Sequence, residues 1–186
     1  MAVLNTKNDF TKETIHLMIT NKCNRRCPDC CNNQYNISDI PIVTSQELAE
    51  SKYVYLTGGE PFAYGDPCLI AERLKMYYPN IKEVIVYTNA LELYQYLNKN
   101  NLFAIDGLTI SIKNSLDAFV FNNYLSKDSR ILSLDSNRLY VFEGFENIEC
   151  PDSIEKMIRT WQKEFVAAPD SIFRRVGKWD FIDDRG

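Results

Sequence analysis

The chain has 186 residues, a net charge of −4 and 45% hydrophobic residues, which suits one soluble domain with a buried core. Without a basic surplus, nucleic acid is not expected as a partner. No apolar run approaches the roughly 18 residues of a membrane span, and Met1–Thr14 lacks the apolar segment of a signal peptide. We therefore expect a cytoplasmic protein with no membrane partner. Its six cysteines then favour metal binding or catalysis over disulfides.

Strand-like and helix-like segments alternate along the chain. In chain order, the predicted elements are strand Thr14–Thr20, helix Thr44–Ser51, strand Tyr53–Thr57, helix Asp66–Tyr78, strand Lys82–Thr88, helix Ala90–Lys99, strand Gly107–Lys113, helix Ser115–Ser126, strand Arg138–Glu143 and helix Asp152–Phe165. Such alternation predicts βαβ units and a parallel sheet. A complete eight-fold barrel needs about 250 residues. We therefore expect an α/β fold, an open partial (β/α) barrel of about five to six parallel strands with flanking helices.

The expected organisation is a single domain over residues 1–186, with a core at about 14–165. Residues 169–186 give no assignment. In parallel α/β folds, ligands bind beyond the carboxyl ends of the strands, where the connecting loops gather. Two motifs occur at such positions.

The first motif follows the first predicted strand and has the spacing C-x₃-C-x₂-C, at Cys23, Cys27 and Cys30. Three thiolates on one loop suit a 4Fe–4S cluster and leave one iron open, as reactive metal sites require. A fourth ligand at ferredoxin spacing is missing. The alternative is a structural zinc site in a zinc-stabilised binding module. The candidates for its fourth ligand are Cys31, Cys68, Cys150 and His16.

The second motif, TGGEP at Thr57–Pro61, ends the second predicted strand. Its glycines let the backbone approach a ligand closely, and Glu60 offers an acceptor for an ammonium group. The two motifs on consecutive strands resemble the radical SAM enzyme superfamily, with the resemblance covering about residues 14–145. It implies that Cys23, Cys27 and Cys30 hold a 4Fe–4S cluster. It also implies that Gly58, Gly59 and Glu60 bind the amino group of S-adenosyl-L-methionine (SAM).

The same resemblance implies reductive cleavage of SAM to methionine and a 5′-deoxyadenosyl radical, which abstracts hydrogen from a substrate. The electron would come from a donor of the flavodoxin or ferredoxin type. Asn89, in a turn similar to the family's TNG turn but with Ala90 in place of glycine, and Ser111 are implied as further cofactor contacts. Asp29 stands where the family usually has an aromatic residue beside the adenine, so adenine packing must come from elsewhere.

The period of two along a strand predicts which side chains face the interior of the barrel. Ile15, Leu17 and Ile19 should pack beneath the helices. The expected inward set is His16, Met18, Thr20, Tyr53, Tyr55, Thr57, Ile85, Tyr87, Asn89, Thr109, Ser111, Lys113, Tyr140 and Phe142. So many polar and aromatic groups indicate a ligand cavity rather than a filled core.

The residues that act on the substrate are not defined by either motif. The candidates are His16, Tyr55, Tyr87 and Lys113, all from the inward set. A tyrosine-lined interior can stack a heterocycle, which favours a small or nucleoside-like substrate. A peptide or protein substrate is the alternative, because a short open barrel can admit one.

Overall fold

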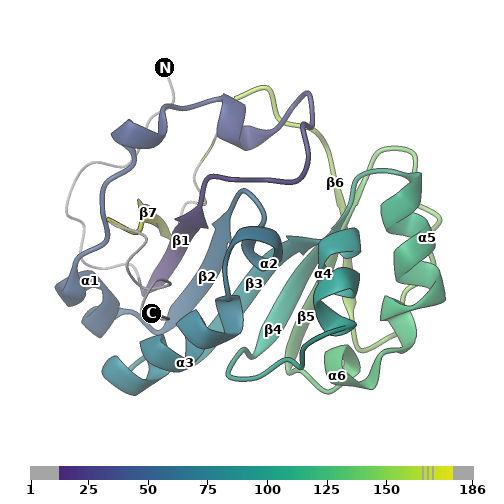
Figure 1. Ribbon diagram of the computed structural model, residues 1–186. Helices are drawn as coiled ribbons and strands as arrows, with labels where there is room; N and C mark the ends of the chain where they lie inside the picture. The colour runs from purple at the N-terminus through teal and green to yellow at the C-terminus, as the bar shows by residue number, and fades with distance from the viewer. Residues whose placement is uncertain (1–12, 165, 167, 169, 178–186) are drawn as a thin grey trace.

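A computed structural model of the chain describes residues 13–164, 166, 168 and 170–177. These residues form an open, all-parallel sheet of seven strands in the spatial order β6-β5-β4-β3-β2-β1-β7 (Figure 1). The strands are β1 Thr14–Thr20, β2 Tyr53–Gly58, β3 Glu83–Asn89, β4 Gly107–Ile112, β5 Ser136–Phe142, β6 Glu155–Arg159 and β7 Ile172–Arg175. The predicted α/β fold with a parallel sheet and flanking helices is confirmed, with more strands than the five to six expected.

Strands β1 to β6 follow one another across the sheet in chain order, and β7 joins the other side of β1. Right-handed crossovers that all step in one direction place their helices on one face of the sheet. The helices are α1 Ser45–Glu50, α2 Pro61–Tyr64, α3 Pro67–Tyr77, α4 Ala90–Leu97, α5 Ser115–Asn123 and α6 Ser129–Leu132, with short 3₁₀ turns η1 Cys31–Asn33, η2 Ile37–Asp39 and η3 Leu125–Lys127. The opposite face is left for loops.

Side-chain caps define where the helices begin. Thr44 and Glu47 form the predicted capping box at α1, each accepting a hydrogen bond from the other's backbone N–H. Asp66 caps α3 as predicted, with Pro67 in the first turn. Asn89, the last residue of β3, caps α4 by accepting from the Glu92 N–H, so strand and helix join without a loop.

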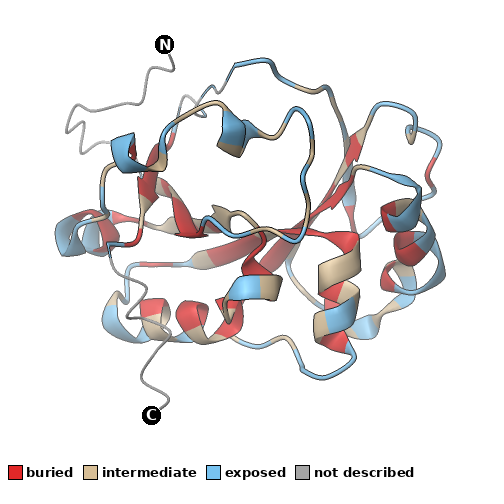
Figure 2. Ribbon diagram, turned by 45° about the horizontal axis from the view of Figure 1, so that its top comes forward, coloured by how far each residue is buried: buried red, intermediate tan, exposed pale blue. Residues whose placement is uncertain are grey.

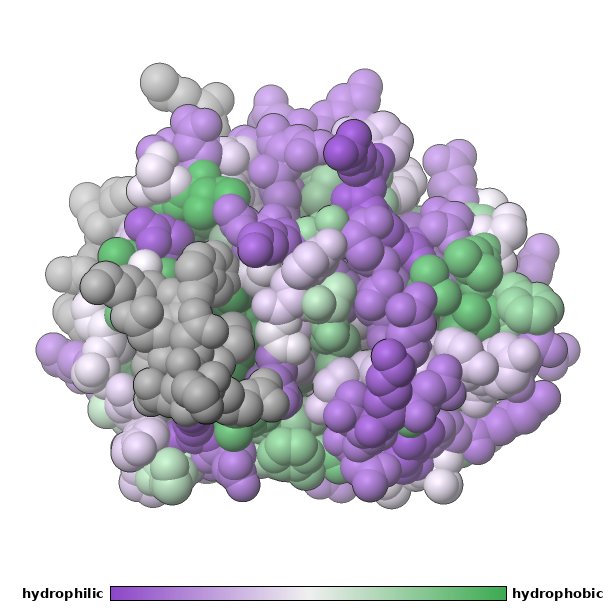
Figure 3. Space-filling model, in the orientation of Figure 1, coloured by the Kyte–Doolittle hydropathy of each residue, from purple (hydrophilic) through white to green (hydrophobic). Residues whose placement is uncertain are grey.

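The two faces of the sheet have different partners, as the period of two predicts. Ile15, Leu17 and Ile19 of β1 belong to one large buried cluster, to which all six α-helices contribute (Figure 2). A small second cluster on the other face contains Met18 and Phe173. Away from the core, apolar surface lies over α5 in Figure 3, where Leu116 and Phe119 are exposed.

The predicted helix over Asp152–Phe165 is wrong, because this segment contains β6, Glu155–Arg159. Phe165 itself lies outside the described residues. Strand β6 pairs with β5 from Arg138↔Glu155 to Phe142↔Arg159. It is an edge strand with exposed outward residues, so its sequence lacks the apolar run of a buried strand. Pairing with β5 overrides the local helical pattern.

Strand β7, Ile172–Arg175, lies in the region without a predicted assignment. It pairs with β1, and its Arg174 forms a buried ion pair with Glu47 of α1 at 2.7 Å. The expectations for residues 1–12 and 178–186 lie outside the described residues. No helix in the described part of the chain is both long and apolar enough to span a bilayer.

Candidate functional site

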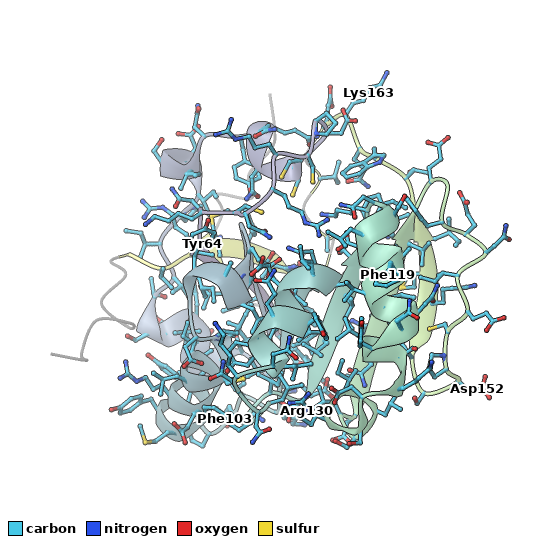
Figure 4. All side chains as sticks on the ribbon, turned by 45° about the vertical axis from the view of Figure 1, so that its right-hand side comes forward. Tyr64, Phe103, Phe119, Arg130, Asp152 and Lys163 are labelled. Atoms are coloured by element: carbon cyan, nitrogen blue, oxygen red, sulfur yellow. The ribbon has the colours of Figure 1, made fainter. Side chains whose placement is uncertain are left out.

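The cysteine loop and the TGGEP turn are in direct contact at the carboxyl ends of β1 and β2. The Gly59 N–H donates to the carbonyl of Thr20 at 2.7 Å, and the Glu60 N–H donates to the carbonyl of Lys22 at 2.8 Å. From there the segment between β1 and α1 crosses above the strand ends, where several sulfur atoms are visible (Figure 4). The fold thus brings the two sequence motifs together as one structural unit.

The two glycines are required by this contact. A Cβ at Gly58 would lie 2.0 Å from the Thr20 carbonyl oxygen, and one at Gly59 would lie 1.9 Å from that of Lys22. Gly58 also has a φ of +132°, which favours glycine. The sequence suggested close approach to a ligand, whereas the neighbour in the structure is the cysteine loop. A role of Gly58 and Gly59 in binding SAM stays a prediction.

Glu60 is buried and its carboxylate holds four donors. Oε1 accepts from Thr88 Oγ1 at 2.6 Å and from the Phe62 N–H at 3.3 Å. Oε2 accepts from the Asn89 N–H at 2.9 Å and from Asn89 Nδ2 at 2.5 Å. Burial raises the pKa of Glu60 to about 7. Glu60 therefore ties the end of β2 to the end of β3, and a ligand ammonium would have to replace one of these donors.

Two residues that the sequence did not single out anchor the cysteine loop. Arg25 forms a bidentate ion pair with Asp117 of α5, in which Nη1 donates to Oδ2 at 2.5 Å and Nη2 donates to Oδ1 at 2.6 Å. The Asp117 side chain is fully buried. Asn24 accepts from Asn89 Nδ2 at 3.2 Å and donates to Glu92 Oε1 at 2.6 Å. The loop is thus fixed to the end of β3 and to helices α4 and α5, as well as to the turn at the end of β2.

The three thiols of Cys23, Cys27 and Cys30 are half-buried on this loop. Burial raises the pKa of Cys23, and the nearby charges of Glu60, Cys30 and Cys27 raise it further. Among the described residues, no three Cys, His, Asp or Glu side chains are placed to hold a metal ion. The thiols are neighbours and chemically suit an iron–sulfur cluster, but binding one would require their side chains to turn toward each other.

The candidates for a fourth zinc ligand are mostly distant from this loop. Cys68 is fully buried in the cluster beneath the helices. Cys150 donates to the carbonyl of Ile154, in the segment that leads into β6. His16 packs among tyrosines. Cys31, which is exposed and follows Cys30, is the candidate that lies on the loop itself.

A row of aromatic side chains crosses the loop-covered face of the sheet. His16 packs on Tyr55 with ring centroids 4.8 Å apart, Tyr55 on Tyr87 at 6.0 Å, and Tyr87 on Tyr140 at 5.9 Å. These rings come from β1, β2, β3 and β5, so the predicted inward register is confirmed. Three of the four candidates for substrate contact, His16, Tyr55 and Tyr87, are thus brought together on one face with Tyr140.

A cavity of about 520 Å³ lies above this row. Its walls include His16, Thr57, Tyr87 and Tyr140, and Cys31 of the cysteine loop. The cavity therefore lies between the aromatic face of the sheet and the loop that holds the thiols.

Three predicted residues lie beside the cavity rather than in its wall. Tyr55 packs against His16, and Met18 is buried against Phe173. Lys113 follows β4, with its Nζ 5.4 Å from the ring centroid of Phe142 and 5.7 Å from that of Trp161. Direct substrate contact by Tyr55 and Lys113 stays a prediction.

Asn89 and Ser111, the predicted cofactor residues on β3 and β4, are paired in register. Both are largely buried, and Asn89 is already bonded to Glu60 and Asn24. Asn89 ends β3, and Ser111 lies one residue before the end of β4, so both are at the carboxyl edge of the sheet. Their contact with SAM stays a prediction.

Burial lowers the pKa of His16 to about 4. An unfolded histidine has a pKa of about 6.5. The neutral, buried His16 therefore makes its full contribution to stability above pH 6.5, and this contribution is lost as the pH drops toward 4. Replacing His16 with Phe keeps a ring against Tyr55 and removes the titration. Between pH 7 and pH 4, wild type should lose about 2 kcal/mol more unfolding free energy than His16→Phe, measured by urea denaturation. Parallel pH profiles would contradict this.

No protein-family model matches the chain, and no curated protein matches it either.

Proposed function

We propose that this chain is a radical SAM enzyme whose sheet forms an open partial (β/α) barrel. The observation that carries the proposal is the contact between the C-x₃-C-x₂-C loop and the TGGEP turn at neighbouring strand ends. Helices pack on one face of the parallel sheet, and an aromatic-lined cavity opens on the other. Ligands of parallel α/β folds bind at such strand ends.

In this proposal Cys23, Cys27 and Cys30 hold a 4Fe–4S cluster with one open iron. When bound, the cluster supplies the electron that cleaves SAM to methionine and a 5′-deoxyadenosyl radical. The protein contributes position: Arg25 and Asn24 fix the loop over the strand ends, and Glu60 fixes the turn beside it.

The SAM methionyl group would lie against the TGGEP turn, near Asn89 and Ser111. Its ammonium group would replace one of the four donors that the Glu60 carboxylate accepts in the structure. A flavodoxin- or ferredoxin-type protein would deliver the electron. The substrate would enter the cavity above Tyr87, which suits a small molecule better than a folded protein.

The test is SAM cleavage by the anaerobically reconstituted chain in the presence of dithionite. We expect slow release of 5′-deoxyadenosine without any substrate, measured by liquid chromatography. A Cys27→Ala chain treated in the same way serves as the control and should release none. A wild-type chain that takes up zinc but no iron, or that leaves SAM intact, would contradict the proposal and favour the zinc-stabilised binding module.

A further inference from the structure

The cavity above the tyrosine row has an unusual charge for an acidic protein. The chain has a net charge of −4, yet no Asp or Glu is among the described residues that line the cavity. Arg159 is the one formally charged side chain in that set. His16, which also lines it, is neutral at pH 7 because burial lowers its pKa to about 4. The cavity therefore presents a single positive charge.

Arg159 is held in place by an aromatic ring instead of a carboxylate. It is the last residue of β6, in register with Phe142, and its guanidinium carbon lies 4.9 Å from the ring centroid of Tyr140. Within the described residues it has no ion pair, whereas Arg138 on the neighbouring strand is paired with Glu155. A stacked guanidinium keeps its edge N–H groups free for a planar oxyanion.

The other walls fit an aromatic ring. Tyr87 and Tyr140 meet edge to face, and His16 lies 5.8 Å from Tyr87, so ring faces and polar edges both border the space. A volume of about 520 Å³ is within the range for one small organic ligand. Aromatic walls favour planar ligands because rings pack in offset or edge-to-face contacts.

We propose that the cavity binds a planar aromatic or heteroaromatic anion, whose carboxylate or phosphate pairs with Arg159. It is a ligand other than SAM, since none of the five residues predicted to bind SAM lines the cavity. The identification of this anion as the substrate rests on the proposed function. The binding of the anion in the cavity does not depend on that function. Cys31 is part of the cavity wall, so a bound ring would lie next to the loop of thiols.

The probe for this proposal is quinoline-2-carboxylate, compared with its neutral amide, quinoline-2-carboxamide. Binding to the anaerobically reconstituted full chain is measured by calorimetry, with and without SAM. We expect the carboxylate to bind wild type on the order of tenfold more tightly than the amide, as a charge-assisted bond predicts. Arg159→Gln should remove this preference, and Arg159→Lys should retain part of it. Phenyl phosphate, as a third probe, separates phosphate from carboxylate as the favoured anion.

Lys99→Gln is the matched control, because it removes one positive charge from an exposed position after α4, on the helical side of the sheet. It should bind all probes as wild type does. Equal affinity of the carboxylate for wild type and Arg159→Gln, absence of binding to wild type, or displacement of the probe by SAM would each overturn the proposal. If the chain binds the carboxylate but neither iron nor SAM, the proposed function fails and this site stands. If the chain cleaves SAM but does not bind the carboxylate, the proposed function stands and this site fails.

Discussion

Replacement of Cys23, Cys27 or Cys30 with Ala is expected to abolish the iron–sulfur cluster. Anaerobic reconstitution of the wild-type chain should give a brown protein with about four irons per chain, the count of one cubane cluster. Each of the three thiolates would hold a different iron, so loss of any one leaves the cluster with two protein ligands. Iron and sulfide analysis, together with the visible absorbance, measures the effect.

The other cysteines provide the controls for this prediction. Cys68→Ala and Cys150→Ala should keep the cluster, because one thiol is buried beneath the helices and the other bonds to the Ile154 carbonyl. Cys31→Ala separates the two metal hypotheses. A cluster with an open iron does not need Cys31, whereas a four-cysteine zinc site would lose its metal. A colourless zinc protein, or a cluster that survives Cys27→Ala, would contradict the assignment.

Local chemistry made much of the fold predictable. The β-branched segments at Thr14–Thr20 and Tyr53–Thr57 form strands, and Thr44 and Asp66 cap the helices that they were predicted to start. The inward register was predictable for the same reason, because strand residues alternate between faces. Tyr87 lies on the expected face with His16 and Tyr140.

Features that depend on distant partners were not predictable. Strands β6 and β7 form at the two edges of the sheet, where pairing with one neighbour stabilises segments with weak local patterns. The ion pair of Arg25 with Asp117 joins residues 92 positions apart, and neither residue belongs to a recognisable motif. One signal was available: Asp117 is the third residue of a helix that starts right after β4, at the sheet edge expected for ligands.

The TGGEP turn shows that one pattern can have two physical causes. Its two glycines indicate close approach of another group, and the sequence alone does not say which group. In the structure the approaching atoms are the carbonyl oxygens of Thr20 and Lys22. The motif thus positions the cysteine loop whether or not it also contacts SAM. Substitution of either glycine would disturb both functions at once, so glycine variants cannot separate them.

Replacing Arg25 with Met should lower the free energy of unfolding by about 3 kcal/mol and release the cysteine loop. The substitution leaves the fully buried Asp117 carboxylate with the backbone N–H of Lys113, at 3.2 Å, as a donor just after the end of β4. A buried charge that loses its partner is costly, typically about 3–5 kcal/mol. Urea denaturation of the metal-free chain measures the free energy of unfolding. The iron that the reconstituted chain retains after gel filtration shows whether the loop still holds its thiols in place.

Arg26→Met is the matched control, since Arg26 is the exposed neighbour on the same loop and its loss should change stability by no more than about 0.5 kcal/mol. The double variant Arg25→Met/Asp117→Leu removes both charges, so it should recover most of the stability. It should still retain less iron than wild type, because the loop lacks its anchor to α5. Equal effects of Arg25→Met and Arg26→Met would show that the ion pair contributes nothing. Full iron retention in the double variant would show that the pair stabilises the fold without positioning the thiols.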